Sequence, residues 1–345
     1  MNFLSSLVPG IEAYLPLLDP DIWLYLPNMQ CNFKCIYCYM DRAANPRGCQ
    51  NHSYRFRLPE KIKIAKNWIV LYGGEPLSDK ELLYKLILAI RQMTQAPIIF
   101  STNGSLLSYK DVNFFKTWNV KISVSYDGRY QKYRGLDIFK NKNHLSILYK
   151  AYKKGVMYGI NTVVHDKNLY NYKFDIPKFR VIHDYNYIYP IETAINKKFL
   201  LDNTKADSIA RNVALNMRAL LKDTQHLSAK TLTLKYPPYL FYLLNSILQL
   251  YTHDDTDTLS PDLPLCDQIH CVKVDIYGNI VCGKGLETKA NQIKPLGNAC
   301  ASCKYCSICS FKCSSNKFDR SLCKDSYVYK IYRAVDLLLQ EIAGN

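Results

Sequence analysis

The chain has 345 residues, a formal net charge of +16 and 13 cysteines. This length allows about two or three domains and excludes a peptide-sized or disulfide-stapled scaffold. Apolar residues make up 48% of the chain and charged residues 21%, which excludes wholesale disorder.

The longest apolar stretch, Tyr239 to Tyr251, is shorter than the roughly 18 residues that span a bilayer. Residues 1–20 have no basic leader before their apolar residues, so they do not resemble a secretory signal. We therefore expect a cytoplasmic protein without a membrane anchor. In a reducing cytosol, an odd number of cysteines favours metal or redox chemistry over a disulfide framework.

Between Asp21 and about Tyr189, short β-branched and aromatic runs alternate with helix-length amphipathic segments. This alternation predicts an α/β domain with a parallel sheet built from βα units. The predicted strands are Ile22–Leu26, Trp68–Tyr72, Ile98–Ser101, Lys121–Ser125, Gly159–Val164 and Tyr185–Tyr189. The predicted helices are Glu60–Lys66, Ser78–Gln92, Ser108–Lys116 and Asn143–Lys154. The second of these helices begins with a capping box, in which Glu81 follows Ser78 by three residues.

The remainder of the chain differs in composition. Thr204–Lys222 and Pro238–Tyr251 predict two helices of a connector, and a last helix is predicted over Tyr327–Ile342. Nine of the 13 cysteines lie between Cys266 and Cys323, in a region where metal coordination takes the place of a hydrophobic core. We therefore expect an N-terminal segment (1–20), a barrel domain (21–190), a helical connector (191–261) and a cysteine-rich domain (262–345).

Three cysteines follow the first predicted strand, in the order Cys31-Asn-Phe-Lys-Cys35-Ile-Tyr-Cys38. Three thiols are one ligand short of a closed tetrahedral site. A [4Fe-4S] cluster that they hold leaves one iron open to an outside ligand, which is the condition for chemistry rather than electron storage. A zinc site completed by a residue such as His52 is the alternative from spacing alone.

Three more motifs follow the next three predicted strands. They are Gly73-Gly74-Glu75-Pro76, Thr102-Asn103-Gly104 and Ser125-Tyr126-Asp127-Gly128. Each motif alone is compatible with a tight turn, and Asp127 is as well suited to ordering that turn as to a role as base or ribose contact. Because the loops after parallel strands lie on one edge of a sheet, four motifs in register indicate an active site there.

The CxxxCxxC motif followed by Gly-Gly-Glu-Pro resembles the radical S-adenosylmethionine (radical SAM) superfamily, over roughly Ile22 to Val164. The resemblance implies a partial (β/α)6 barrel whose three cysteines hold a [4Fe-4S] cluster that binds SAM. The residues that it implies at the SAM site are Tyr37 beside the adenine, Gly73 and Gly74 close to the ligand, Glu75 at the ammonium group, Asn103, Ser125 at the ribose and Arg134 at the carboxylate. Reductive cleavage of SAM would give a 5'-deoxyadenosyl radical that abstracts hydrogen from a substrate.

The C-terminal cysteines resemble the SPASM extension of radical enzymes that act on peptides and proteins. That resemblance implies two auxiliary [4Fe-4S] clusters, one held by Cys266, Cys271, Cys282 and Cys313 and the other by Cys300, Cys303, Cys309 and Cys323. Cys49 and Cys306 are then unassigned, and Gly278 stands one residue closer to Cys282 than is usual in the family. The alternatives are a ferredoxin-like run through Cys303, Cys306, Cys309 and Cys313, and a structural zinc site between Cys300 and Cys309.

These resemblances predict an enzyme that modifies a residue of a peptide or protein, such as a ribosomally made precursor peptide, and that needs a reducing partner such as ferredoxin or flavodoxin. The positive charge suits an acidic leader peptide, and a nucleic acid partner stays open. Gly283 stands where sulfatase-maturing members carry Asp, which argues against that particular reaction. The alternatives are a radical enzyme for a nucleotide, RNA or small metabolite, and a non-catalytic iron-sulfur electron carrier. None of the histidines His52, His165, His183 and His270 is needed as a ligand.

Overall fold

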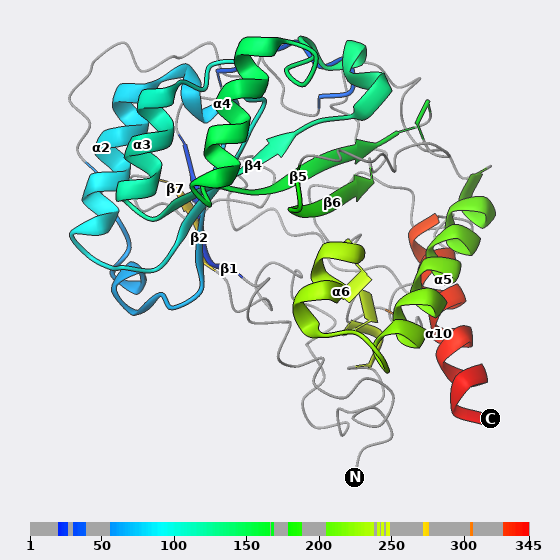
Figure 1. Cartoon of the computed structure of the whole chain (residues 1–345). Coiled ribbons are helices and arrows are strands. Elements are labelled where there is room, and N and C mark those ends of the chain that lie inside the picture. Colours follow the sequence, from blue (N-terminus) through cyan, green and yellow to red (C-terminus); the bar gives the residue numbers. More distant parts are fainter. Residues whose placement is uncertain are drawn as a thin grey trace, which may run out of the picture.

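The computed structural model describes residues 20–26, 30–38, 56–165, 167–168, 179–187, 205–237, 240–241, 243–244, 246–248, 272–275, 304–305 and 327–344. Figure 1 shows a parallel sheet covered by helices and, beside it, a smaller group of helices that includes the last one of the chain. Residues 1–19 of the predicted N-terminal segment, and every cysteine outside residues 31–38, lie outside the described residues.

Seven strands form one sheet, and every neighbouring pair is parallel. They are β1 (Pro20–Tyr25), β2 (Trp68–Tyr72), β3 (Ile98–Thr102), β4 (Val120–Ser125), β5 (Met157–Val164), β6 (Ile182–Tyr187) and β7 (Val272–Asp275). The order across the sheet is β6-β5-β4-β3-β2-β1-β7, so the first six strands follow one another in chain order. This arrangement confirms the predicted α/β class and partial (β/α)6 barrel.

Strands β1 to β5 begin and end within two residues of their predicted bounds, and two other features of the sheet differ more from the sequence prediction. Strand β6 begins at Ile182, three residues before the predicted start at Tyr185. Strand β7 comes from the predicted cysteine-rich region and pairs with β1, where Ile22 lies opposite Val272. The predicted cysteine-rich region therefore contributes a strand that lies beside β1, the strand that precedes the first three cysteines.

The helices between the strands lie side by side on one face of the sheet (Figure 1). They are α2 (Lys80–Arg91), α3 (Tyr109–Thr117) and α4 (Lys142–Lys153), with short 3-10 helices η3 (Glu60–Ile64), η4 (Pro76–Ser78) and η5 (Gly128–Tyr133). The predicted capping box at Ser78 is wrong. Ser78 belongs to η4, and the Asp79 carboxylate caps α2 by accepting a hydrogen bond from the Leu82 N–H at 3.0 Å.

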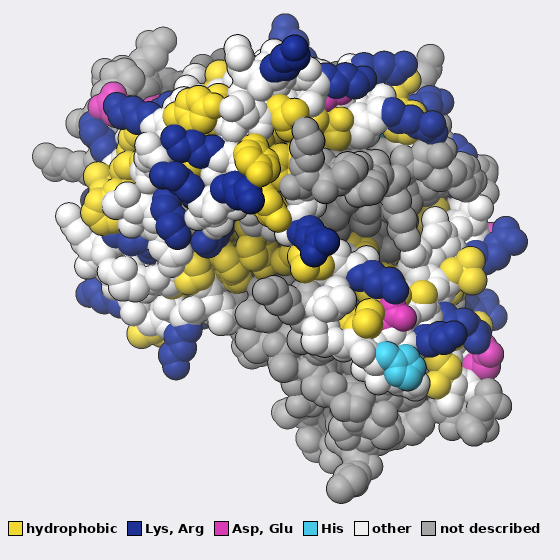
Figure 2. Space-filling model, in the orientation of Figure 1, with side chains coloured by type: hydrophobic (Ala, Val, Ile, Leu, Met, Phe, Trp, Pro, Cys, Tyr) yellow, Lys and Arg dark blue, Asp and Glu magenta, His cyan; other side chains and the backbone are white. Residues whose placement is uncertain are grey.

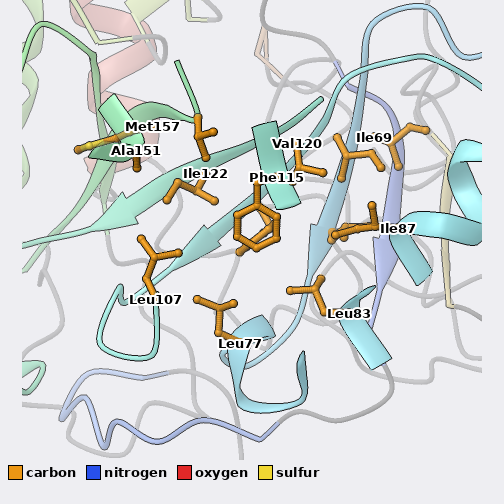
Figure 3. Close-up of a cluster of buried hydrophobic side chains, with 14 of the residues drawn as sticks. Ile69, Leu77, Leu83, Ile87, Leu107, Phe115, Val120, Ile122, Ala151 and Met157 are labelled. Atoms are coloured by element: carbon orange, nitrogen blue, oxygen red, sulfur yellow. The ribbon is translucent and has the colours of Figure 1, made fainter. Parts of the chain in front are cut away.

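The core lies between these helices and the sheet. Figure 3 shows Leu83 and Ile87 of α2 and Phe115 of α3 directed toward Ile69 and Ile122 of the strands. All five side chains are buried. Each such side chain stabilises the fold by about 1.5–3 kcal/mol relative to an exposed one, so the apolar faces of α2 and α3 fix the sheet from which the loops of the site extend.

A second apolar cluster joins the helices outside the barrel. Helix α5 (Ala206–Asp223) packs against α10 (Tyr327–Gly344), and α6 (Ala229–Lys235) follows α5 in the chain. Residues 240–248 are helical where they are described. Two predicted helices of the connector and the C-terminal helix thus occur near their predicted places, whereas α6 was not predicted. Within the described residues, no helix has the length and apolar character needed to cross a membrane.

Asp111 joins α2 to α3 and gives a testable measure of that packing. Its buried carboxylate accepts hydrogen bonds from Lys80 Nζ at 2.7 Å, from the Tyr84 hydroxyl, and from the backbone N–H and hydroxyl of Ser108. Burial opposes ionisation, yet these donors hold the pKa of Asp111 below its usual value. We expect Asp111→Asn to lower the free energy of unfolding by about 2–3 kcal/mol at pH 7.

The lowered pKa fixes the pH dependence of this effect. A depressed carboxyl pKa adds stability above the unfolded value of about 3.9, and that stability is lost as the pH falls through the folded value. In urea unfolding, the free energies of unfolding of the unchanged chain and Asp111→Asn should therefore differ by a constant amount from pH 7 to about pH 5. This difference should become smaller below about pH 4. The exposed Glu81→Gln on the same helix is the control, and it should change the free energy of unfolding by less than about 0.5 kcal/mol.

Candidate radical SAM site

The cysteine loop, residues 30–38, lies at the carboxyl ends of the strands and is held there from several sides. Its first residue accepts a hydrogen bond from the backbone N–H of Glu75, which follows β2, at 2.7 Å. Its Asn32 receives a hydrogen bond from Asn103 Nδ2 at 2.8 Å and donates one to Ser105 Oγ at 2.8 Å, both beyond β3. These contacts bring together the cysteine, Gly-Gly-Glu-Pro and Thr-Asn-Gly motifs, as the sequence predicted.

The three cysteines lie within this loop, packed around Phe33 and Tyr37. Cys35 is buried, Cys31 and Cys38 are half-buried, and the Cys38 N–H donates to the Cys35 carbonyl at 3.0 Å. A Cβ on Gly135, after η5, would lie 2.9 Å from the Phe33 ring, so this glycine lets η5 pack closely on the loop. The Ile36 N–H completes the contact by donating to the Tyr133 carbonyl at 3.1 Å.

The ligand type indicates which metal group suits the loop. Three soft thiols on one short loop are the ligands that a [4Fe-4S] cluster with one open iron takes. His52, which would complete the zinc alternative, lies outside the described residues. Burial raises the pKa of the Cys35 thiol to about 11 in the metal-free chain.

Glu75 is 2% exposed and joins the ends of β2 and β3. Its Oε1 accepts hydrogen bonds from the Thr102 hydroxyl at 2.6 Å and from the Leu77 N–H at 3.2 Å. Its Oε2 accepts one from the Asn103 N–H at 2.7 Å, which leaves an acceptor position on that oxygen. Burial raises the pKa of Glu75, and the three donors counteract that rise.

Asp127 and Arg134 form a buried ion pair beneath the cysteine loop. Arg134 donates from a terminal guanidinium nitrogen to Asp127 Oδ1 at 3.1 Å, and the Val163 N–H donates to the same oxygen at 3.1 Å. The Tyr37 hydroxyl donates to Asp127 Oδ2. The Asp127 side chain is fully buried. One carboxylate thus ties the cysteine loop to the ends of β4 and β5 and to η5.

The surroundings of this pair are aromatic and cationic. The Tyr37 ring stacks on His165, with the ring centroids 5.2 Å apart, and the Arg134 guanidinium lies 5.5 Å from the Tyr37 ring centroid. Burial lowers the pKa of His165 to about 4, so the imidazole is neutral at pH 7. Arg134 is also buried, and its pKa is nevertheless raised by the Asp127 carboxylate. The Arg134 Nε–H is buried and has no hydrogen-bond partner within the described residues, which leaves a donor for an anionic group.

Other predicted positions lie at the same edge of the sheet. Ser125 ends β4, where it is in register with Asn161 of β5. A Cβ on Gly73 would lie 3.0 Å from the Leu26 Cβ, so glycine lets the loop after β2 approach the end of β1. Gly104 has a φ of +74°, and a Cβ there would meet Ile138 at 2.8 Å. Glycines of these motifs therefore allow close packing at this edge of the sheet.

The sequence did not identify every residue that builds the site. The role of Asn32 in linking the cysteine loop to Asn103 was missed because a lone Asn carries no motif. His165 was predicted to be a hydrogen-bonded or exposed residue, and it does accept a hydrogen bond, from the Lys167 N–H at 3.1 Å, but its stacking on Tyr37 was not foreseen. Cys49, His52, His270 and all the predicted auxiliary ligands lie outside the described residues, as does the His183 side chain.

Comparison with known proteins places this geometry in a family. The family model described as the Radical SAM superfamily matches residues 25–168, which include the cysteine loop and all the strand-end motifs. Residues 25–168 belong to the radical SAM superfamily. Membership supports an enzyme that uses SAM and a [4Fe-4S] cluster. Among curated proteins, the chain is 26% identical over 136 residues to the radical SAM cyclopropyl synthase TigE of Paramaledivibacter caminithermalis, covering 32% of this chain and 29% of TigE.

Two solved structures share the radical SAM fold with most of this chain. One is anSMEcpe with bound AdoMet and the Cp18Cys peptide, with a TM-score of 0.59, 18% identity, and coverage of 94% of this chain and 100% of that one. The other is Streptococcus suis SuiB bound to the precursor peptide SuiA, with a TM-score of 0.50, 15% identity, and coverage of 87% and 73%. The chain spans between 13% and 51% of the length of the curated relatives that it matches.

Proposed function

We propose that the protein is a radical SAM enzyme that modifies a residue of a peptide or protein. The observation that carries the radical chemistry is the cysteine loop, which is fixed at the carboxyl edge of the sheet by Glu75, Asn103 and Asp127. The peptide substrate is supported by the two solved structures of the same fold that hold peptides.

Different residues of the chain would bind the cluster and SAM. Cys31, Cys35 and Cys38 would hold the [4Fe-4S] cluster, and a reduced cluster with SAM supplies a 5'-deoxyadenosyl radical that abstracts hydrogen from the substrate. The remaining acceptor position of Glu75 Oε2 suits the SAM ammonium group, and the partnerless Arg134 Nε–H suits its carboxylate. Both groups are buried and already oriented by other bonds, so little ordering is needed when SAM binds.

The other SAM contacts stay proposals that rest on the family resemblance. Tyr37 would lie beside the adenine and Ser125 at the ribose, with Gly73 and Gly74 allowing a close backbone approach. His165 supports Tyr37 from below by stacking and carries no charge at pH 7, which keeps the aromatic part of the site apolar.

The C-terminal cysteines extend the proposal. We assign Cys266, Cys271, Cys282 and Cys313 to one auxiliary cluster, and Cys300, Cys303, Cys309 and Cys323 to the other, in a SPASM-like domain over residues 262–345. Such a cluster, fully ligated by the chain, would serve as an acceptor for the electron that a substrate radical loses on oxidation, and a ferredoxin or flavodoxin would supply the electron for cleavage of SAM. If Cys306→Ala removes about four irons per chain, the ferredoxin-like ligand set replaces this assignment.

The experiment that tests the function is an anaerobic incubation of the reconstituted, reduced chain with SAM. We expect 5'-deoxyadenosine to form. When SAM and a short peptide encoded beside the gene are both added, we expect the mass of that peptide to change. A protein that forms no 5'-deoxyadenosine is an electron carrier and contradicts the proposal. Consumption of a nucleoside or metabolite, with no peptide changed, would move the substrate to the alternative class.

Glu75→Gln tests the ammonium contact. The glutamine loses the negative charge, and if its carbonyl oxygen keeps the two bonds at the Oε1 position, its NH₂ group faces the Asn103 N–H. The loss of one charge-assisted hydrogen bond costs about 1.5–3 kcal/mol, so we expect the Kd for SAM to rise about 10- to 100-fold. Equilibrium binding to the reconstituted protein measures this. Iron content should stay unchanged, and an unchanged Kd would show that Glu75 only joins β2 to β3.

A further inference from the structure

A band of lysines covers the outer side of α3 and α4. We call it the lysine face. It also includes Lys154, which follows α4, and Lys121 of β4, which donates to the Gly155 carbonyl beside it; the full set is Lys110, Lys116, Lys121, Lys142, Lys150, Lys153 and Lys154. Figure 2 shows Lys and Arg side chains gathered over these helices, with hydrophobic side chains between them. The face lies outside the proposed catalytic site and has no role in it.

Side-chain contacts join the two helices into one continuous surface. Lys150 Nζ lies 4.6 Å from the centroid of the Tyr109 ring, and the Tyr109 hydroxyl is 2.7 Å from Ser146 Oγ. Lys154 Nζ donates to Asn113 Oδ1 at 2.7 Å. Each of these contacts joins α3 to α4 or to the residue that ends α4. The lysines of both helices therefore lie on one surface.

The charge of the lysine face is not balanced from within. Residues 107–155 contain three acidic side chains, and each is paired elsewhere: Asp111 with Lys80, Asp127 with Arg134 and Asp137 with Lys140. None of the seven lysines forms an ion pair with a carboxylate in the described part of the chain. Burial, and then the nearby Lys116, lowers the pKa of Lys121, as expected where like charges are crowded.

Several lysines elsewhere on the described surface do pair with carboxylates, although Lys34, Lys132 and Lys222 do not. Ion pairs with carboxylates are made by Lys63, Lys85, Lys235, Lys304 and Lys330. A lysine-rich but otherwise ordinary surface would show such pairs on α3 and α4 as well. The concentration of unbalanced charge on one face therefore indicates an acidic partner supplied from outside.

The face begins beside the cysteine loop. At the start of α4, His144 Nε2 lies 2.9 Å from the Ser105 carbonyl oxygen, and Ser105 Oγ accepts a hydrogen bond from Asn32 of that loop. From Lys142 the face follows α4, which has 12 residues and is thus about 18 Å long. This length matches about five or six residues of extended peptide, one end of which would lie near the carboxyl edge of the sheet.

We propose that the lysine face binds an acidic stretch of the peptide substrate, outside the residue that is modified. This inference rests on the proposed function, because it takes the substrate to be a peptide. All seven cations are lysines, which offer point charges to carboxylates, whereas phosphate recognition favours the planar fork of arginine. Tyr109 and Tyr149 are each 44% exposed, but a lysine ammonium lies over each ring, so neither is a bare stacking platform for bases.

The test uses the reconstituted full chain and labelled probes of equal charge. One probe is a 12-residue peptide of alternating Glu and Ser, and the other is a thymidine heptanucleotide with six phosphates. The variant of the lysine face is Lys142→Gln/Lys150→Gln/Lys153→Gln. The control, Lys61→Gln/Lys63→Gln/Lys66→Gln, removes the same charge around η3.

We expect the Glu-Ser peptide to bind, more weakly as salt increases, and its Kd to rise about tenfold in the face variant but not in the control. The inference is overturned if the peptide does not bind, if both variants lose affinity equally, or if the oligonucleotide binds more tightly and depends on the same lysines. Formation of 5'-deoxyadenosine without a peptide should be equal in all three proteins. Its absence would contradict the proposed function, whereas a failure of peptide binding alone would contradict only the lysine face.

Discussion

Replacing Cys35 with alanine is expected to remove about four irons per chain and to abolish formation of 5'-deoxyadenosine, while the sheet stays folded. Cys35 is the buried member of the three cysteines, and the loop around it is held by backbone and side-chain bonds that do not involve its sulfur. A cluster bound through two thiolates lacks a ligand for one of its protein-bound irons, so it should not survive purification. Iron analysis and chromatography of the SAM products measure both effects.

Cys49→Ala provides the matched control. It also removes a thiol from the N-terminal part of the chain, but the proposed ligand set does not use that thiol. We expect this variant to keep its iron and its SAM cleavage. Far-ultraviolet circular dichroism of Cys35→Ala should equal that of the unchanged chain, because α2, α3 and α4 do not pack on this cysteine. Undiminished 5'-deoxyadenosine in Cys35→Ala would disprove the assignment of the cluster to Cys31, Cys35 and Cys38.

The order of the barrel elements was predictable because each strand and helix carries its own local signal. Strand β2 begins at Trp68 and ends at Tyr72, as predicted. Helix α3 begins with a capping box of Ser108 and Asp111, two residues three apart in the sequence. Strand β7 was not predictable in this way. Its four residues pair with β1 across more than 240 residues of chain, and no local pattern in Val272–Asp275 specifies that partner.

In the site, too, local motifs were predictable and contacts between distant segments were not. Motifs that follow strands could be placed together, because parallel strands deliver their carboxyl ends to one edge, and the structure does bring Glu75 and Asn103 to the cysteine loop. What each carboxylate binds could not be read from the sequence. Asp127 could have ordered its own turn, but its oxygens are taken by Tyr37, Arg134 and the Val163 N–H, which come from three other segments.

These three partners make Asp127 a positioning residue for the cysteine loop, and Asp127→Asn tests it. Asparagine loses the charge that balances Arg134. If its oxygen stays at the Oδ1 position, where it serves Arg134 and the Val163 N–H, its NH₂ group meets the Tyr37 hydroxyl, which is a donor. Leaving a buried charge unpaired costs about 3–5 kcal/mol of stability. We expect a loss of that size in urea unfolding and a rise of about tenfold or more in the Kd for SAM.

Loss of stability alone would not distinguish positioning from simple packing, so the pair must also be removed together. In Asp127→Leu/Arg134→Met no buried charge is left unpaired, and such replacements are often close to neutral in stability. We expect this double variant to regain most of the free energy of unfolding and still bind SAM poorly, because the Tyr37 hydroxyl has lost its acceptor and Arg134 its Nε donor. Tyr37→Phe, which removes only the hydroxyl, should show an intermediate Kd. If the double variant bound SAM as tightly as the unchanged chain, the ion pair would be structural and the cysteine loop would be positioned by Asn32 and Gln30 alone.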